Sequence, residues 1–543
     1  MANALAHLVQ VEVGGVQSYI FNGSRLRGWR GASALLDRAE RLKIPEVLRN
    51  QYGGAVRTLR QGGGVVLLGV QGGGPDPEEV AETVEDTHKE HAPGARVYSA
   101  SVPFDGGDVS ASLAALTFEA TDARNRAPQT DPDVPLLGAM SRPCGSCGTR
   151  PAETDSEIAD DGTLLCLVCA RKATHGRRVR GGQEEGSVLA RFAAHLEATD
   201  APSVSVDALA DCVPADLNAV AEAGNGSVAL IQADGNSLGK TIQQIRTRDQ
   251  YEALSGGLTE AVQKAVFNTL AEHGPRPPKG ASAGTLPWEI IFLGGDDVLL
   301  ATADDIALEV AQGLTRRIEA RTGDLFGQAP LDALGRSRLT MGTGVVVADP
   351  HVPMAVLRRL AHSLERSAKD RTYHLIEAEG REVSTLDFHR VTGSGSASLS
   401  HIRDHVLRPR HTAAGYEASL TQRPFTIDEL ETVVDVAQQW RAGQVPGNKL
   451  QALRESLFAS PAQAMRQWTH VVARAPKGRR DTWQALEALT DPGGKHAPSG
   501  ASVKMPFVEH GPSASRGSSR PGQTPRATTP LLDVLDVYAL LSN

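Results

Sequence analysis

The chain has 543 residues, of which 40% are hydrophobic, so three or four domains with sizeable buried cores are expected. Its formal net charge is −8 and only 4% of its residues are aromatic, which excludes a general nucleic-acid coat and widespread base stacking. No stretch approaches the roughly 20 apolar residues that cross a bilayer, and the first residues lack a secretory signal.

The N-terminal part predicts a domain that mixes strands and helices. Residues 8–13 predict a strand and residues 35–48 a helix. Gly62-Gly63-Gly64 then leads into the apolar run 65–68, which predicts a second strand. We expect these elements to form one α+β domain, residues 1–135.

Four of the five cysteines form two pairs with the spacing C-x₂-C-x₁₈-C-x₂-C: Cys144, Cys147, Cys166 and Cys169. This spacing is typical of a ribbon that holds zinc tetrahedrally, and four thiolates leave no open position, so we expect a structural site. A redox pair is the alternative, but one redox pair needs no partner at this spacing. Cys212 is expected to be an unreactive packing residue. Because no disulfide framework is implied, we expect a reducing, cytoplasmic compartment.

The ribbon is assigned to residues 136–175 and a mainly helical linker domain to residues 176–225. Two short basic segments stand out, 177–180 and 477–480. Either could contact RNA, but a solvated surface is the simpler explanation.

An apolar strand runs into Asp234 and is followed by a glycine turn and a helix from Leu238. The triplet Gly239-Lys240-Thr241 resembles a phosphate-binding loop, but that motif needs a glycine where this chain has Asp234. An aspartate would point negative charge at the phosphates. We therefore reject this loop and treat Asp234 as a candidate metal ligand.

Residues 290–300, the GGDD hairpin, predict a buried hairpin with the turn Gly294-Gly295-Asp296-Asp297 between two apolar runs. The glycines leave the backbone open to a bulky group. Paired aspartates repel each other unless a cation or solvent separates them, although many acidic turns only solvate a loop. With Asp234, three carboxylates suit two Mg²⁺ (or Mn²⁺) ions, because magnesium prefers few carboxylates plus phosphate oxygens.

Together these motifs resemble the polymerase-like large subunits of type III CRISPR effector complexes, whose palm is related to GGDEF diguanylate cyclases. The matching parts are Asp-Gly-Asn-x-Leu-Gly-Lys at 234–240, the GGDD hairpin, the strand 341–348, Pro353-Met354 and a helix ending in Ala368-Lys369. The resemblance implies an α+β fold of two ferredoxin-like palm (nucleotide cyclase-like) domains, with a Cys₄ zinc ribbon between them and a C-terminal helical domain. The first palm, residues 1–135, would be non-catalytic, and the second would span residues 226–392.

The resemblance also implies an activity. The 3′-hydroxyl of one NTP would attack the α-phosphate of another and release pyrophosphate, converting ATP to cyclic oligoadenylate, a second messenger in antiviral defence. Asp234, Asp296 and Asp297 would hold the two Mg²⁺ ions. Nucleotide contacts would come from Gly294, Gly295, Asn236, Lys240 and Lys369, with Ser18 of the first palm facing the second nucleotide.

Two other functions stay open. One keeps the chemistry but makes cyclic dinucleotides from GTP or mixed NTPs. The other is a scaffold subunit that binds guide RNA and other CRISPR effector subunits without nucleotide turnover. Many family members begin with an HD-type nuclease domain, whereas this chain starts at the first palm and none of its sixteen histidines precedes an aspartate. We therefore expect no DNase activity.

The second palm is completed by helices at 249–273 and 304–322 and by a closing strand at 386–389. Asp304 and Asp305 are expected to interact with the helix dipole rather than with a metal. His389 is expected to be structural.

A helical domain is predicted for residues 393–490, with helices at 401–408, 427–442 and 446–470. Residues 491–529 are rich in Pro, Gly, Ser and Thr, so we expect disorder. The last segment, 530–543, predicts a terminal docking helix.

Overall fold

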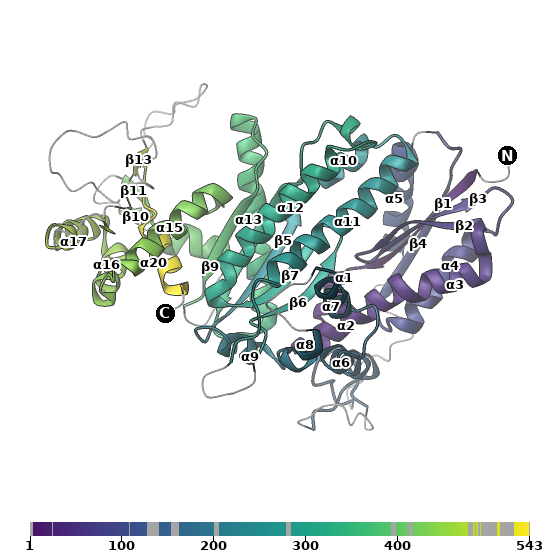
Figure 1. Cartoon of the computed structure of the whole chain (residues 1–543), viewed down its shortest axis with the longest axis horizontal. Helices are drawn as coiled ribbons and strands as arrows, with labels where there is room; N and C mark the ends of the chain where they lie inside the picture. Colours follow the sequence, from purple (N-terminus) through teal and green to yellow (C-terminus); the bar gives the residue numbers. More distant parts are fainter. Residues whose placement is uncertain are drawn as a thin grey trace. The chain divides into compact units, whose positions relative to one another are not determined.

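Figure 1 shows the computed structural model of the chain, coloured along the sequence. The chain divides into two compact units: residues 1–303, 307–341 and 349–358 form the first, and residues 304–306, 342–348 and 359–543 form the second. The structure describes residues 4–23, 25–107, 109–126, 141–153, 162–199, 206–277, 284–392, 398–408, 410–411, 416–475, 482–483, 485–486, 489, 508–510 and 526–541.

The first unit begins with a four-stranded antiparallel sheet in the order β2-β3-β1-β4. Its strands are β1 (Leu5–Gly14), β2 (Val56–Gly62), β3 (Val65–Gln71) and β4 (Arg96–Pro103). Its helical segments are α1 (Val16–Phe21), α2 (Leu26–Arg38), the π-helical turn η1 (Ala39–Lys43), α3 (Ile44–Tyr52), the short turn η2 (Gly53–Ala55), α4 (Pro77–His91) and α5 (Val109–Arg126). This order of strands and helices is the ferredoxin-like arrangement, so the predicted first palm fold is confirmed.

Apolar side chains from one face of this sheet form its core with α3 and α4. Val9 and Val11 alternate along β1 and are fully buried, as successive strand residues on one face must be. They belong to one cluster with Ile44 of α3 and Val80 and Val84 of α4. Burial of each such side chain contributes roughly 1.5–3 kcal/mol to folding.

Helices lead from the ribbon to the second palm: α6 (Leu167–Arg180), α7 (Val188–Thr199), α8 (Val206–Cys212) and α9 (Leu217–Glu222). The described residues between 176 and 225 are mainly helical, and the boundaries of a linker domain stay a prediction. Helix α6 packs along α2. Arg30 of α2 forms an ion pair with Glu289 of β6, with 2.7 Å between Nε of the arginine and Oε1 of the glutamate. Both side chains are buried.

The second palm repeats the plan of the first. Its elements in the first unit are β5 (Val228–Gly235), α10 (Leu238–Gln244), α11 (Arg248–Leu270), β6 (Trp288–Gly294), β7 (Asp297–Ala303), α12 (Ala307–Phe326) and the turn η4 (Asp332–Leu334). Strand β5 pairs with β7 and β7 with β6, as β1, β3 and β2 do in the first palm. Helices α11 and α12 lie side by side (Figure 1).

Capping residues explain where the long helices of this palm begin. Thr247 forms a capping box with Gln250 at the start of α11. The turn η3 (Asp304–Ile306) immediately precedes α12, so Asp304 and Asp305 lie at its start as predicted.

The second unit contains parallel β8 (Met341–Ala348) and β9 (Thr385–Arg390), and β12 (Phe425–Thr426) pairs antiparallel with β9. A second small sheet has the order β10-β11-β14-β13, with β10 (Arg410–His411), β11 (Tyr416–Ser419), β13 (Val508–His510) and β14 (Arg526–Thr528). The helical segments are α13 (Met354–Glu379), whose residues 354–358 belong to the first unit, α14 (Leu399–His401), the π-helical turn η5 (Ile402–Val406), α15 (Ile427–Ala442), α16 (Gly447–Ala459), α17 (Pro461–Ala473) and α20 (Leu531–Leu540).

Three predicted elements differ from the structure. Helix α13 continues past Lys369 and ends before Gly380, whose φ of +67° is left-handed. The predicted helix 446–470 is two helices, because Ser460 caps a new helix that has Pro461 at its first position.

The third difference lies in the segment predicted to be disordered, 491–529. Residues 508–510 and 526–528 form strands that pair with each other, so the prediction is wrong there. The basic segment 477–480 lies outside the residues that the structure describes.

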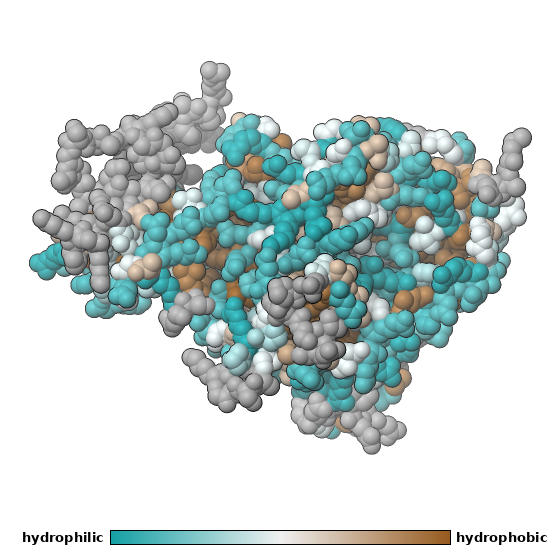
Figure 2. Space-filling model, viewed as in Figure 1, coloured by the Kyte–Doolittle hydropathy of each residue, from teal (hydrophilic) through white to brown (hydrophobic). Residues whose placement is uncertain are grey.

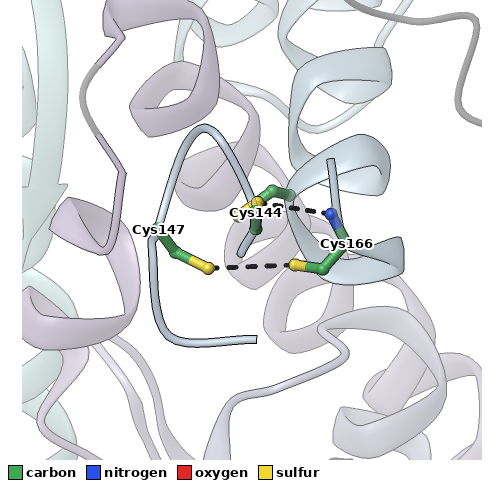
Figure 3. A group of neighbouring side chains, drawn as sticks. Cys144, Cys147 and Cys166 are labelled. Atoms are coloured by element: carbon green, nitrogen blue, oxygen red, sulfur yellow. Dashed lines mark hydrogen bonds between the residues drawn. The ribbon is translucent and has the colours of Figure 1, made fainter. Parts of the chain in front are cut away.

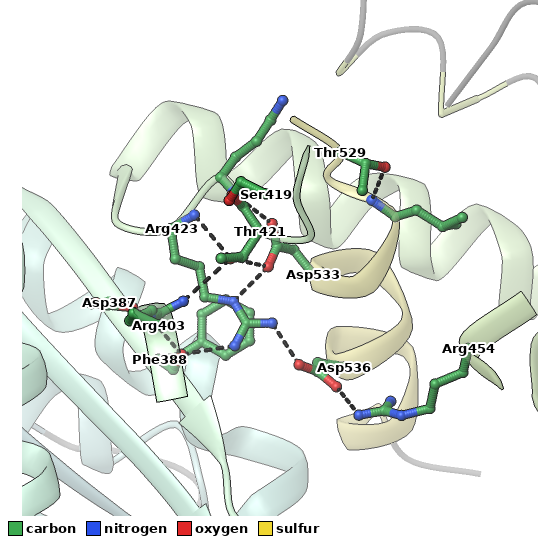
Figure 4. Close-up of polar contacts among 12 residues, drawn as sticks. Asp387, Phe388, Arg403, Ser419, Thr421, Arg423, Arg454, Thr529, Asp533 and Asp536 are labelled. Carbon is green, nitrogen blue, oxygen red and sulfur yellow. Dashed lines mark hydrogen bonds and ion pairs between the residues drawn. The ribbon is translucent and has the colours of Figure 1, made fainter. Parts of the chain in front are cut away.

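Helix α20 is fixed in the second unit by buried charges (Figure 4). Arg423 donates to Asp533 from Nε at 2.7 Å and to Asp536 from Nη2 at 2.5 Å. Its guanidinium also lies 3.9 Å from the ring centroid of Phe388. Both Arg423 and Asp533 are almost inaccessible to solvent, so the predicted terminal helix is a core element.

On the face shown in Figure 2, hydrophilic residues cover most of the outer surface of α11 and α12. This distribution agrees with helices that bury one side against a sheet. Among the described helices, none is both long enough and apolar enough to cross a membrane.

Candidate active site and zinc site

The GGDD hairpin has a two-residue turn. Gly294 pairs with Asp297 in the β6–β7 ladder, so Gly295 and Asp296 form the turn itself. Gly295 has a φ of +64°, a left-handed conformation that glycine adopts without strain. Asp296 is therefore at the tip of the hairpin, and Asp297 begins β7.

Asp234 reaches the same place from β5. The β5–β7 register pairs Ala233 with Val298, which brings the next residue, Asp234, to the start of β7. A Cβ on Gly235 would lie 2.7 Å from Oδ2 of Asp296, so only glycine leaves room for that carboxylate. The structure thus brings Asp234 and Asp296 together, 62 positions apart in sequence.

Asp234 and Asp296 are both half-buried. Burial first, and then the neighbouring Asp234 carboxylate, raise the pKa of Asp296 to about 7, while Arg60 of β2 opposes the shift. Without a counter-ion, two adjacent carboxylates disfavour each other's ionisation. A divalent cation would relieve this repulsion, and carboxylate oxygens are the ligands that Mg²⁺ prefers, so the residues present fit that ion.

Asp297 contacts the first palm instead. Gln17 of α1 donates from Nε2 to Oδ2 of Asp297 at 3.5 Å, and Arg358 donates to Oε1 of Gln17 at 3.3 Å. Within the described ranges, the cysteine cluster is the only set of three or more His, Cys, Asp or Glu residues whose ligand atoms all lie within 4.8 Å of one another. Asp234, Asp296 and Asp297 therefore do not form a closed set of three ligands.

The other predicted nucleotide contacts are spread over both units. Asn236 is fully buried and donates from Nδ2 to Oγ1 of Thr340 at 3.1 Å. Lys240 is exposed in the first turn of α10, and Ser18 is exposed on α1. Lys369, in the second unit, lies 3.1 Å from the Glu365 carboxylate. Their roles at a nucleotide stay predictions.

Sequence reasoning missed three residues around this site. Arg336 donates to the carbonyl oxygen of Asn236 at 2.7 Å and to the Thr241 hydroxyl, and so supports the turn after β5. Gln17 and Arg358 approach Asp297 from distant positions. None of the three lies in a motif, and only the fold brings them near the carboxylates.

The four ribbon cysteines form one cluster in which all sulfur atoms lie within 4.8 Å of one another. The sulfurs of Cys147 and Cys166 lie 3.9 Å apart, and the backbone N–H of Cys166 donates to the Cys144 sulfur at 3.3 Å. Figure 3 shows the three side chains. Tetrahedral zinc with bonds of about 2.3 Å separates its sulfur ligands by about 3.8 Å, so the cluster fits zinc.

Lys172 connects the ribbon helix to the first palm. Its Nζ lies 3.7 Å from the ring centroid of Tyr19 and donates to the Tyr19 carbonyl oxygen at 2.5 Å. Burial lowers the pKa of Lys172 to about 8. Lys172 and Cys169 lie on the same helix, so the predicted ribbon is packed against the first palm.

The palm geometry agrees with a known family. Residues 227–374 match the family model described as Cas10/Cmr2, second palm domain. This segment contains β5, the GGDD hairpin and most of α13. No curated protein matches the chain.

Several solved structures are similar to this chain. Csm1 in T. onnurineus is 14% identical with a TM-score of 0.49, over 91% of this chain and 65% of that one. A chain of the Csm1-Csm4 cassette in complex with cA4 is 13% identical with a TM-score of 0.41, over 68% of this chain and 53% of that one. This chain therefore spans little more than half the length of that protein.

At such identities and TM-scores, these likenesses carry no argument by themselves, and the assignment rests on the family model. Its match covers the segment in which Asp234 and Asp296 meet. The predicted resemblance to the large subunits of type III CRISPR effector complexes is thereby confirmed for the second palm: residues 227–374 match the second palm domain of the Cas10/Cmr2 family.

Proposed function

We propose that this protein is a Mg²⁺-dependent nucleotidyltransferase that converts ATP to cyclic oligoadenylate with release of pyrophosphate. The observation that carries the proposal is the close approach of the half-buried Asp234 and Asp296, at the end of β5 and the tip of the GGDD hairpin. Two carboxylates at this place can hold a cation together with the phosphate oxygens of a substrate.

Each part of the site has a physical role in this proposal. Asp234 and Asp296 hold the cation, and Asp297 is available from the start of β7. Bound Mg²⁺ would lower the cost of forming the attacking 3′-oxygen and of releasing pyrophosphate. Gly294 and Gly295 carry no side chain that could block ribose and phosphate at the hairpin. Lys240 would neutralise triphosphate charge.

The test is turnover by the full chain with each of the four NTPs in Mg²⁺, with pyrophosphate and product mass as readouts. ATP should give pyrophosphate and cyclic adenylates, and Asp234→Asn and Asp296→Asn should each reduce the rate by at least about 100-fold. Arg49→Gln, an exposed change on α3, is the control and should match the wild type.

The same assay with four NTPs distinguishes the two alternative functions from the proposed one. Product from GTP or mixed NTPs alone would replace the adenylate assignment with a cyclic dinucleotide synthase. No product from any NTP, with and without added RNA, would reject the enzyme, and short RNA bound to the purified chain would then favour a scaffold subunit of a CRISPR ribonucleoprotein.

A further inference from the structure

The glycine turn of the first palm, Gly62–Gly64, lies against the GGDD hairpin of the second. It joins β2 to β3, and all three residues have positive φ: +113°, +69° and +84°. A Cβ on Gly294 would lie only 2.7 Å from the Cα of Gly63. The two hairpins therefore touch backbone to backbone, one residue from the turn that carries Asp296.

One buried carboxylate holds the glycine turn in place. Glu40 is 2% exposed, and its Oε2 accepts the backbone N–H of Gly64 at 3.3 Å. The carbonyl oxygen of Gly64 accepts from the N–H of Val13 at 2.7 Å. Both polar backbone groups of Gly64 are thus fixed, one by β1 and one by a side chain.

The position of Glu40 is set by an irregular part of the helix. It lies in the π-helical turn η1 between α2 and α3, where the chain departs from α-helical spacing. Its other oxygen lies 3.8 Å from Nε2 of His88, a fully buried residue of α4. A carboxylate acceptor strengthens a hydrogen bond to a backbone N–H, and Glu40 makes this bond to a residue 24 positions further along the chain.

We propose that Glu40 is a positioning residue for the candidate active site. Glu40 fixes Gly64, the glycine turn supports Gly294, and Gly294 precedes the turn residues Gly295 and Asp296. Glu40 touches neither substrate nor metal. This inference rests on the proposed function for its effect on turnover, but its effect on the order of the GGDD hairpin is independent of any activity.

The test compares three variants of the full chain. Glu40→Gln keeps an acceptor for Gly64, Glu40→Ala removes it, and Glu40→Asp keeps the charge but shortens the side chain by one methylene. Glu184→Ala is the matched control, because Glu184 is also 2% exposed and its contacts are to Arg38 and His175, outside both hairpins.

Hydrogen exchange at residues 293–298 is the first readout. In Glu40→Ala and Glu40→Asp these amides should exchange at least about tenfold faster than in the wild type. In Glu40→Gln their exchange rates should stay near those of the wild type. Equal protection in Glu40→Asp and the wild type would overturn the inference, as would the same loss of protection in Glu184→Ala.

Nucleotide turnover is the second readout. Glu40→Ala would shift the GGDD hairpin but keep the carboxylates of Asp234 and Asp296. It should therefore lower kcat by about 10- to 100-fold with KM changed less than about threefold. Unchanged kcat in a folded Glu40→Asp variant would refute the positioning role. A wild type without turnover, but with the expected exchange pattern, would reject the proposed function and leave the structural role of Glu40 in place.

Discussion

Gly31 of α2 and Gly176 of α6 meet at a helix crossing that has no room for a side chain. A Cβ on Gly31 would lie 2.7 Å from the backbone nitrogen of Gly176 and 1.7 Å from the carbonyl oxygen of Lys172. A Cβ on Gly176 would lie 2.0 Å from the carbonyl oxygen of Arg27. The ribbon helix and the first palm are therefore packed backbone to backbone.

Gly31→Ala should destabilise the first unit by about 3 kcal/mol, because the methyl group can only be accommodated by moving one helix. Gly28→Ala on the same helix has nothing within 4 Å of its new Cβ and should stabilise by up to about 1 kcal/mol. Urea unfolding of both variants measures the difference. Equal stability of the two would contradict the tight crossing.

Loss of zinc should loosen the packing of the ribbon helix α6 against α2. The purified chain should contain one zinc per molecule, and Cys166→Ser should lose most of it and lower the Tm, because three ligands hold the ion much more weakly. Burial raises the pKa of the Cys212 thiol, which lies outside the cluster. Cys212→Ser should therefore keep its zinc, and metal analysis showing equal loss in both variants would refute the Cys₄ assignment.

Asp533→Ala should destabilise the second unit by about 3–5 kcal/mol, because it leaves the guanidinium of Arg423 buried without a main partner. Arg454 also binds Asp536, but its side chain is 24% exposed, so Arg454→Ala should cost at most about 1 kcal/mol. Tryptophan fluorescence during urea unfolding reports on this unit, since Trp440, Trp468 and Trp483 pack together there. A smaller effect from Asp533→Ala than from Arg454→Ala would be inconsistent with this network.

His389 should make the second unit sensitive to acid. Burial, then Arg423 and Arg403, lower the pKa of His389 to about 4 despite the opposing charge of Asp536. Between pH 6.5 and pH 4 the unfolded chain binds this proton and the folded chain does not. Stability is therefore complete above about pH 6.5 and falls, by at most about 3 kcal/mol, as the pH drops to 4.

His389→Gln should flatten this dependence when urea midpoints at pH 7 and pH 4.5 are compared. His470→Gln, an exposed change on α17, is the control and should leave the dependence intact. If His389→Gln retained the full slope, another group would be responsible.

Local patterns predicted the parts of the fold that depend on local spacing. The cysteine spacing predicted the Cys₄ cluster, and two apolar runs around Gly294-Gly295-Asp296-Asp297 predicted the β6–β7 hairpin. The break at Ser460-Pro461 was also present in the sequence as a helix-start signal, but the apolar periodicity continues across it.

No local sequence pattern predicted the contacts between residues that are far apart in the chain. Arg30 pairs with Glu289 across 259 positions, and Gln17 approaches Asp297 across 280. Glu40 looks like any helical glutamate until the fold places Gly64 beside it. The charge of a residue is visible in sequence, but its partner is decided by tertiary packing.

The pairing of Arg423 with Asp533 has a consequence for the order in which the protein is made. Asp533 follows Arg423 by 110 positions. At about 5–20 residues per second, a ribosome adds the second partner roughly 5–20 s after the first. Throughout that interval the guanidinium lacks the anions that allow its burial. The second unit can therefore complete its core only after Asp533 has been synthesised, whereas the two hairpins that meet at Gly63 and Gly294 can assemble well before that.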